Sequence, residues 1–248
     1  MTPRMWTPSA ETGSKRELVT AWSPGVWRLR LSSSRTVRAG IVDRSGSPEV
    51  LRSRVRFAGG YVEAEQVHGA SLAAVERSSS PPDAVSGCDA LVTQTPDLGL
   101  VIRSADCLPI FLWDPIRRVV GVAHAGWRGV ARQLPGRLVA FVQRHYRSRP
   151  RELWFAIGPS VRACCYEVGP EFEKPFGPFL QRQGGRLTCD LVACAMQQLI
   201  RAGVAAGRIL DTGSCTACET DRWFSLRKEG ERGGRLLSFI GLSASAAG

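Results

Sequence analysis

Four short apolar runs, separated by turn residues, fill the stretch from residue 89 to residue 123 and limit what this chain can fold into. The runs cover residues 89–93, 99–103, 108–113 and 118–123. Apolar runs of this length, bounded by Gly, Pro and Asp, are typical of strands and too short for helices. We therefore expect the middle of the chain to form a β-sheet.

Helical periodicity is clearest over residues 188–202, where Leu191, Ala195 and Leu199 fall on one apolar face and Gly203 stands at the C-terminal cap position. Residues 126–146 also predict helix, which Pro135 must break or restart. Strands mixed with a few helices predict an α/β or α+β fold. We expect a loose lead-in over residues 1–20 and a single catalytic domain over residues 21–248.

Weaker patterns complete the expected order of elements. The polar, glycine-bearing stretch 32–47 predicts no regular element, and residues 78–87, with Ser-Ser-Ser-Pro-Pro, predict a surface loop. Further strands are expected at 27–31, 61–67, 70–75, 152–157, 208–210 and 235–242, with a short helix at 48–57.

Composition excludes several classes of protein. Hydrophobic residues make up 44% of the chain, too many for a disordered protein. No apolar run reaches the roughly 18 residues of a membrane span, and residues 1–16 lack the apolar stretch of a secretory signal. We therefore expect a cytoplasmic protein with no membrane partner.

The net charge of +11 raises the question of an acidic partner. Most of the excess lies in residues 1–60, which hold 11 Lys and Arg against 4 Asp and Glu. Such a segment can attract nucleic acid or anionic metabolites. The basic residues are not interleaved with aromatic ones in any recognisable module, so no nucleic-acid partner is expected.

A hairpin in the central strands brings two potential metal ligands together. Residues 105–113 run into Asp114-Pro115 and the chain returns over residues 118–124. A two-residue turn at 115–116 or a four-residue turn at 114–117 places Cys107 directly opposite His124. Opposed side chains share a face with Cβ atoms about 4.5–5.5 Å apart, a separation that suits one zinc ion. A turn of three residues would remove this pairing.

Only three histidines are available, so a third ligand has few candidates. His68 stands at a strand end beside Gly69, whereas His145 follows a basic helical stretch and is expected at the surface. Two imidazoles and one thiolate match an open catalytic zinc site. The alternative, that His68, Cys107 and His124 are hydrogen-bonded or buried filler residues, stays open on spacing alone.

The segment after His124 could bind an anion. It reads Ala125-Gly126-Trp127-Arg128-Gly129 and predicts a strand-to-helix turn with free backbone N–H groups. Arg128 could add a bidentate contact to phosphate or carboxylate. Alternatively, the glycines only permit a tight turn and Arg128 is solvated.

The remaining cysteines include two close pairs, Cys164-Cys165 and Cys215-Thr216-Ala217-Cys218. In a reducing compartment a disulfide framework is not expected. The second pair is a lone C-x-x-C with no partner pair at zinc-ribbon spacing. A structural role and a redox role both remain open for these four, while Cys189 and Cys194 are expected to fill space along the helix at 188–202.

Taken together, these segments resemble the YfiH-like family, long labelled laccase-domain or multicopper polyphenol oxidases and now regarded as purine nucleoside phosphorylases. The resemblance covers about residues 66–242 in order and at family-like spacing. The matching pieces are QVHG at 66–69, SGCDALVT at 86–93, ADCLP at 105–109, GVAHAGWRG at 121–129, AIGPSVRACCYEVG at 156–169, and the tail from Cys215 through FSLR at 224–227 to Gly234-Arg235.

The resemblance implies a compact domain of stacked mixed β-sheets flanked by helices. It also implies Zn²⁺ bound by His68, Cys107 and His124, with copper as the alternative metal. The N-terminus departs from the family pattern, because a Gly-Gly-Val-Ser segment is missing and residues 33–36 are the nearest equivalent. Arg35 is therefore only a weak candidate for substrate or phosphate binding beside Arg128.

The activity that the resemblance implies is phosphorolysis of adenosine, inosine and S-methyl-5'-thioadenosine, with adenosine deamination as a second activity. Purine nucleoside and phosphate are then the partners, and the oligomeric state stays open, a monomer included. Zinc lowers the pKa of its water to about 7, which fits attack on C6 of adenine, while a basic turn fits phosphate attack on ribose C1′.

Three other functions are kept as alternatives. A copper-dependent polyphenol oxidase of the laccase type would need many more histidines than three. A Cys107–His124 hydrolase would use the same pair without metal. A role in editing cell-wall peptidoglycan is the third, and the altered N-terminus keeps it open.

Overall fold

The computed structural model describes residues 18–30, 36–76 and 83–244, and there it consists of two β-sheets stacked face to face. The expected lead-in over residues 1–20 therefore lies almost wholly outside the described residues, as do Arg35 and the first half of the loop expected at 78–87. The second half of that stretch was wrongly predicted as loop, because residues 83–85 form a strand. Within the described part of the chain, no helix is both long and apolar enough to cross a membrane.

The first sheet has seven strands in the order β1-β2-β3-β15-β8-β4-β6. All its neighbours are antiparallel except that β4 pairs in parallel with both β6 and β8. The bounds of these strands, in spatial order, are Val19–Ser23, Val26–Leu29, Val37–Val42, Leu236–Leu242, Gly99–Ser104, Tyr61–Ala64 and Asp83–Val85.

The second sheet has six strands in the order β14-β11-β9-β10-β7-β5. Its two edge strands run parallel to their neighbours and the inner pairs are antiparallel. Its strands, in spatial order, are Ile209–Asp211, Trp154–Ile157, Leu108–Asp114, Val119–Ala125, Ala90–Thr93 and Leu72–Ala74. A separate hairpin pairs β12 (Leu180–Gln183) with β13 (Arg186–Cys189).

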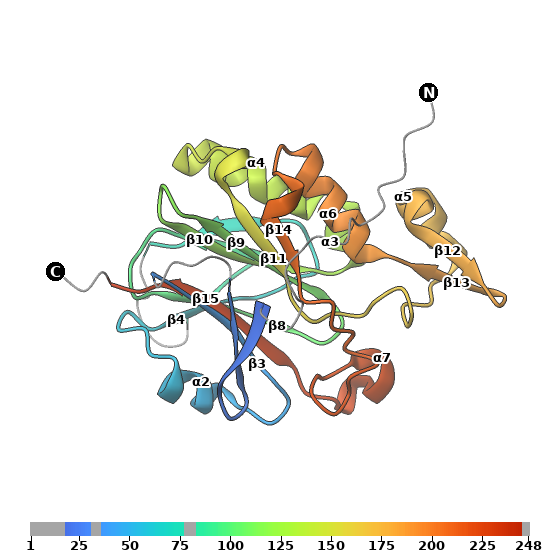
Figure 1. Ribbon diagram of the computed structural model, residues 1–248, viewed down its shortest axis with the longest axis horizontal. Coiled ribbons are helices and arrows are strands. Elements are labelled where there is room, and N and C mark those ends of the chain that lie inside the picture. Colours follow the sequence, from blue (N-terminus) through green and yellow to red (C-terminus); the bar gives the residue numbers. More distant parts are fainter. Residues whose placement is uncertain (1–17, 31–35, 77–82, 245–248) are drawn as a thin grey trace.

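Helices cover the two outer faces, so that the molecule has four layers (Figure 1). Helices α3 (Trp127–Ala131), α4 (Leu134–Tyr146) and α6 (Leu191–Arg201) lie over the second sheet, and α2 (Pro48–Arg54) lies over the first. The two short helices α5 (Glu173–Phe176) and α7 (Leu226–Glu229) lie outside these layers. This arrangement confirms the predicted fold class.

Alternation along β9 shows how the sequence builds these layers. Leu108, Ile110 and Leu112 belong to the apolar core shared with α4 and α6, whereas Phe111 and Trp113 belong to the core between the sheets. All five side chains are buried. A strand buried on both faces is continuously apolar, which is why this run stands out in the sequence.

The predicted hairpin forms between β9 and β10, but its register prediction was wrong by two residues. His124 lies opposite Pro109 rather than Cys107. The turn has four residues, 115–118, because the Asp114 side chain accepts the N–H groups of Ile116 and Arg117 and the strand continues through residue 114. Since side chains alternate with period two, a displacement by two residues leaves Cys107 on the face of His124.

Other expectations about the elements were also wrong. The polar stretch 32–47 contains β3, which lies in the interior of the first sheet. Its Gly40 breaks the apolar pattern, but a Cβ there would lie 2.6 Å from the Phe239 ring, so a side chain has no room.

The helix expected to begin at residue 188 begins instead at Leu191. Asp190 is its N-cap residue, and the Asp190 side chain accepts the Ala193 N–H at 2.9 Å.

Candidate metal centre

His68, Cys107 and His124 come together at one end of the stacked sheets. Their ligand atoms all lie within 4.8 Å of one another, and the two imidazole rings meet edge to face with centroids 4.7 Å apart. His124 comes from β10, Cys107 directly precedes β9, and His68 lies in the loop between β4 and β5. The structure thus brings together the three residues that the sequence singled out.

Asp89 organises this cluster and was missed as a site residue. One of its oxygens lies 3.0 Å from Nδ1 of His124 and also accepts the His68 N–H at 2.9 Å, and the other accepts the Gly69 N–H at 2.7 Å. The carboxylate is wholly buried. A carboxylate on one imidazole nitrogen leaves the other nitrogen free to bind a metal. The sequence did hold one signal for Asp89, because this residue lies in the SGCDALVT segment that resembles the family.

The loop that carries His68 is fastened to both sheets. Gln66 exchanges two hydrogen bonds with the backbone of Arg103 in β8 of the first sheet, at 2.6 and 2.7 Å. Asp89, which holds the other end of the loop, directly precedes β7 of the second sheet. Gln66 and His68 both have positive φ, 64° and 56°, a conformation that costs free energy unless its surroundings impose it. These hydrogen bonds supply that constraint.

Gly126 leaves room for the cluster. A Cβ at this position would lie 3.1 Å from Sγ of Cys107 and 3.5 Å from Cδ2 of His68. Its φ of −70° is open to any residue, so the requirement for glycine comes from space alone. A Cβ would therefore crowd the Cys107 sulfur and come into van der Waals contact with the His68 ring.

The electrostatics of the cluster favour a thiolate. Burial would raise the pKa of Cys107, but hydrogen bonds with His124 and His68 outweigh it and lower the pKa to about 7. Burial would lower the pKa of His124, yet the hydrogen bonds with Asp89 and Cys107 raise it to about 9. The deprotonated thiol is the form in which cysteine binds metal ions.

The donor set fits a divalent transition metal. Two imidazoles and one thiolate match the three protein ligands of a catalytic zinc site, and they also match a blue-copper set. His124 is buried, Cys107 is half-buried and His68 is exposed. A ligand open to solvent leaves the fourth coordination position accessible, which is the arrangement of a catalytic site.

Two arginines lie on the helix that follows His124. Arg128, predicted from the sequence, is exposed on α3, and its guanidinium lies 4.5 Å from the centre of the Trp127 ring. Arg132, which was not predicted, ends α3 and donates to the His68 carbonyl at 3.4 Å. His145 is exposed on α4, as expected, and its ring stacks on Phe141 of the same helix.

Asp106 points away from the cluster and is a structural anchor. Its carboxylate accepts hydrogen bonds from the hydroxyls of Thr216 and Ser225, at 2.6 and 2.7 Å, and from the Arg227 N–H at 2.7 Å. Its φ is 82°. Asp106 therefore fixes the backbone directly before Cys107 against the C-terminal segment.

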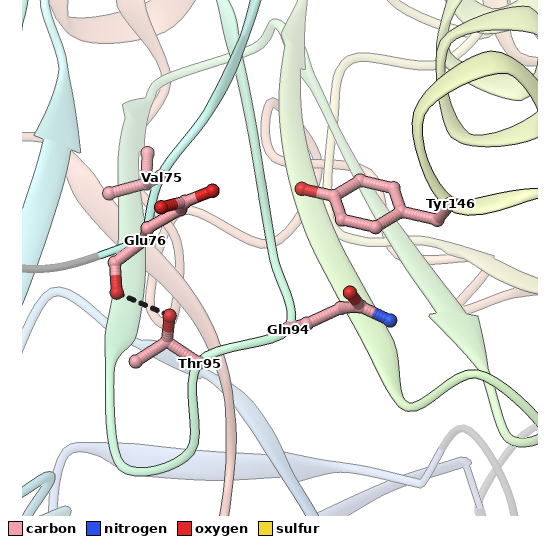
Figure 2. Close-up of a pocket in the computed structure, with 5 residues that line it drawn as sticks. All are labelled: Val75, Glu76, Gln94, Thr95 and Tyr146. Atoms are coloured by element: carbon pink, nitrogen blue, oxygen red, sulfur yellow. Dashed lines mark hydrogen bonds between the residues drawn. The ribbon is translucent and has the colours of Figure 1, made fainter.

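Two open depressions lie away from this cluster. One, of about 460 Å³, is lined by Val75, Glu76, Gln94, Thr95 and Tyr146 (Figure 2), and a hydrogen bond joins the Thr95 hydroxyl to the Glu76 carbonyl. Four of these residues follow the parallel strands β5 and β7 and Tyr146 ends α4, whereas His68 and Asp89 precede those two strands. The second is lined by residues of α2 and its surroundings, including Arg52 and Tyr61.

Comparison with known proteins supports the resemblance seen in the sequence. The family model described as "Multi-copper polyphenol oxidoreductase laccase" matches residues 47–243. The purine nucleoside phosphorylase YlmD of Geobacillus stearothermophilus is 36% identical over 197 residues, which are 73% of this chain and 72% of that protein. The adenosine deaminase RL5, from an unidentified prokaryote, is 32% identical over 190 residues, 71% of this chain and 72% of that protein.

A solved structure agrees with the fold. The crystal structure of the Bacillus licheniformis hypothetical protein YfiH matches with a TM-score of 0.81 at 26% identity, over 91% of this chain and 99% of that chain. The predicted family resemblance and the predicted stacked-sheet architecture are both confirmed.

Proposed function

The chain belongs to the multi-copper polyphenol oxidoreductase laccase family, and we propose that it is a zinc-dependent purine nucleoside phosphorylase with adenosine deamination as a second activity. The observation that carries the proposal is the cluster of His68, Cys107 and His124 around one point, fixed by the buried carboxylate of Asp89. Two relatives, one named a purine nucleoside phosphorylase and the other an adenosine deaminase, suggest the two reactions.

Zinc is proposed rather than copper because the chain has too few histidines to bind several copper ions. A multicopper oxidase binds several copper ions through many histidines, and the whole chain has three. His145 is on the surface of α4, so two remain for the cluster. One open three-ligand site is the pattern of catalytic zinc.

His68, Cys107 and His124 would hold the ion. When bound, zinc supplies a Lewis acid that polarises substrate oxygen or nitrogen and lowers the pKa of water. Asp89 accepts the Nδ1–H of His124, which keeps that ring in one orientation with Nε2 turned to the ligand cluster. The Gln66 and Asp89 hydrogen bonds keep His68 in place while substrate enters from the solvent side.

Phosphate is proposed to bind at α3. Arg128 follows His124 by four residues and carries a planar guanidinium already ordered against the Trp127 ring. Arg132 brings a second positive charge to the backbone of His68. The two arginines would hold phosphate beside the cluster, and we propose adenosine, inosine and S-methyl-5'-thioadenosine as the nucleosides that it attacks at ribose C1′.

The test is a product assay on zinc-loaded protein with adenosine, in the presence and absence of phosphate. Phosphorolysis yields adenine and ribose 1-phosphate and requires phosphate, whereas deamination yields inosine and ammonia without it. Chromatography separates these products. A protein that releases neither adenine nor inosine contradicts the proposal, and so does one whose adenine release is independent of phosphate.

The same protein preparation also tests two of the alternative functions, the polyphenol oxidase and the Cys107–His124 hydrolase. A polyphenol oxidase would bind copper and consume oxygen with a phenol. A Cys107–His124 hydrolase would remain active toward acyl substrates after chelation, because it uses no metal.

A further inference from the structure

Four cysteines from two distant segments meet in a second cluster. Cys164 and Cys165 lie in the turn after β11, and Cys215 and Cys218 lie in the loop after β14. Their sulfur atoms are all within 4.8 Å of one another. The Cys165–Cys218 separation is 3.3 Å, and Cys164 lies 3.7 Å from both Cys215 and Cys218.

These separations match a tetrahedral metal site. Four sulfurs at about 2.3 Å from a zinc ion lie about 3.8 Å from one another in a regular tetrahedron. A disulfide would instead bring two sulfurs to about 2.05 Å, and all four cysteines are free. The C-x-x-C motif of Cys215 and Cys218, which has no partner pair at zinc-ribbon spacing in the sequence, thus lies beside Cys164 and Cys165 in the folded chain.

We propose that Cys164, Cys165, Cys215 and Cys218 bind a second, structural zinc ion through four thiolates. Tetrahedral four-sulfur sites are the characteristic sites of zinc, and four protein ligands leave no position for substrate. The site therefore serves the fold and binds no substrate itself.

The backbone around the cluster is already held in place. Ser160 and Cys215 form a bridge between the two segments, and Arg162 pairs with Asp211 at 2.7 Å while also donating to the Ser214 carbonyl at 3.1 Å. The Cys165 N–H in turn bonds to the Arg162 carbonyl at 2.8 Å. These contacts fix both cysteine pairs before any ion binds, which lowers the entropic cost of binding.

The turn between Cys215 and Cys218 is also ordered. The N–H groups of Cys218 and Glu219 both bond to the Cys215 carbonyl, at 3.2 and 3.0 Å, and the Glu219 carboxylate accepts the Cys215 N–H at 3.1 Å. Both cysteines are therefore presented from one compact turn. Cys215 is buried and Cys218 is exposed, so an ion has a route in from solvent.

The cluster is connected to the first site through Thr216. This residue lies between the two cysteines of the turn, is wholly buried, and donates to Asp106, which directly precedes Cys107. Asp106 holds a φ of 82° against the C-terminal segment. An ion that fixes the cysteine turn therefore also fixes the backbone that presents Cys107.

The experiment uses a variant in which two of the three ligands of the first metal site are replaced, so that only the cysteine cluster can bind zinc. In the His68→Ala/Cys107→Ala variant, purified without chelators, elemental analysis should find one zinc ion per chain. Adding Cys164→Ser and Cys218→Ser, both at exposed positions, should abolish it. The matched control adds Cys189→Ala and Cys194→Ala, which remove two buried thiols outside the cluster and should leave the zinc in place.

Cobalt replacement gives a readout that does not depend on the cysteine variants folding. Co²⁺ added to metal-free His68→Ala/Cys107→Ala protein should give the intense visible bands of a tetrahedral ion together with sulfur-to-metal charge-transfer bands. A zinc-free folded protein with no such bands overturns the proposal. So does peptide mapping, under anaerobic purification, that finds Cys165 and Cys218 joined as a disulfide, or analysis that finds iron in place of zinc.

Discussion

An oxygen of Asp89 lies 3.0 Å from Nδ1 of His124, and the same carboxylate holds the backbone N–H groups of His68 and Gly69. One buried side chain from the start of β7 thus sets the ring of one candidate ligand and the loop of another. The orientation of both candidate ligands thus depends on a residue outside the candidate ligand set.

The Asp89→Asn variant should bind zinc about 10–100-fold more weakly, the usual effect of removing a carboxylate behind a metal-binding histidine. An amide cannot accept hydrogen bonds through both of its polar atoms, so at least one of the bonds to His124, His68 or Gly69 is lost. Competition with a coloured chelator measures the affinity. Asp221→Asn, at an exposed position, is the control; equal affinities in the two variants would mean that packing alone orients His124.

The Cys107→Ala variant should lose one zinc ion per chain and all nucleoside turnover. The far-ultraviolet circular dichroism should stay unchanged, because the cluster lies at strand ends and not within a core layer. Cys194→Ala, on α6, should keep the zinc of the first site and its activity. A Cys107→Ala protein with an unchanged zinc content would remove Cys107 from the ligand set.

The Arg128→Ala variant should lose a charge-assisted contact to phosphate worth about 1.5–3 kcal/mol, or about one to two decades in the phosphorolysis rate. Deamination needs no phosphate and should fall much less. Arg128→Lys keeps the charge without the bidentate geometry and should be intermediate. The two reactions are compared in each variant at saturating adenosine and varied phosphate.

The control for this comparison is Arg144→Ala, an exposed arginine on α4. It should leave both reactions unchanged. Equal losses of phosphorolysis and deamination in Arg128→Ala would show that Arg128 holds the turn or the nucleoside, and an unchanged phosphate dependence would place the anion elsewhere.

The Gly126→Ala variant should bind zinc roughly tenfold more weakly, since overpacking costs about 1–3 kcal/mol. The new methyl group would lie 3.1 Å from the Cys107 sulfur and push it from its place. Gly136→Ala is the matched control, because its Cβ would meet nothing closer than 3.9 Å and it lies within α4. That control should raise the melting temperature slightly, since alanine favours helix. Isothermal titration with zinc compares the two, and similar affinities would contradict the steric argument.

After metal removal, the reactivity of Cys107 should change steeply near neutral pH. Its pKa is lowered to about 7, so its alkylation by iodoacetamide should be slow below pH 7 and rise as the thiolate forms above it. Burial raises the pKa of Cys189 to about 12 and that of Cys194 to about 11, so neither should react in this range. Peptide mapping after timed labelling measures each site. Added zinc should protect Cys107, and a rate that does not change between pH 6 and pH 8 would contradict the assignment.

The three candidate ligands could be predicted from the sequence despite a wrong register. The turn extends one residue further than expected because Asp114 accepts two backbone N–H groups, and this places Pro109 opposite His124. A shift of two residues preserves the face of every side chain, so Cys107 and His124 still meet. A shift of one would have separated them.

Other parts depend on contacts that the sequence does not display. Asp89 is one aspartate among many until the loop carrying His68 folds back onto it, and Arg132 gains its place only through the end of α3. The strand β3 was missed because Gly40, near its centre, interrupts the apolar pattern. Glycine is required there because the Phe239 ring of β15 leaves no room for a side chain. The four cysteines could not be joined from spacing alone, because a bridge between Ser160 and Cys215 brings the pairs together.

The position of β15 has a consequence for how the chain reaches its folded state. This strand follows the other six of its sheet in the chain, yet it lies between β3 and β8 in the sheet's interior. During synthesis, β3 and β8 emerge long before the strand that joins them, and their unpaired edges are open to association with other chains. Such long-range pairing slows folding. The yield of native protein should therefore depend on slow synthesis or chaperone protection more than on the stability of the finished fold.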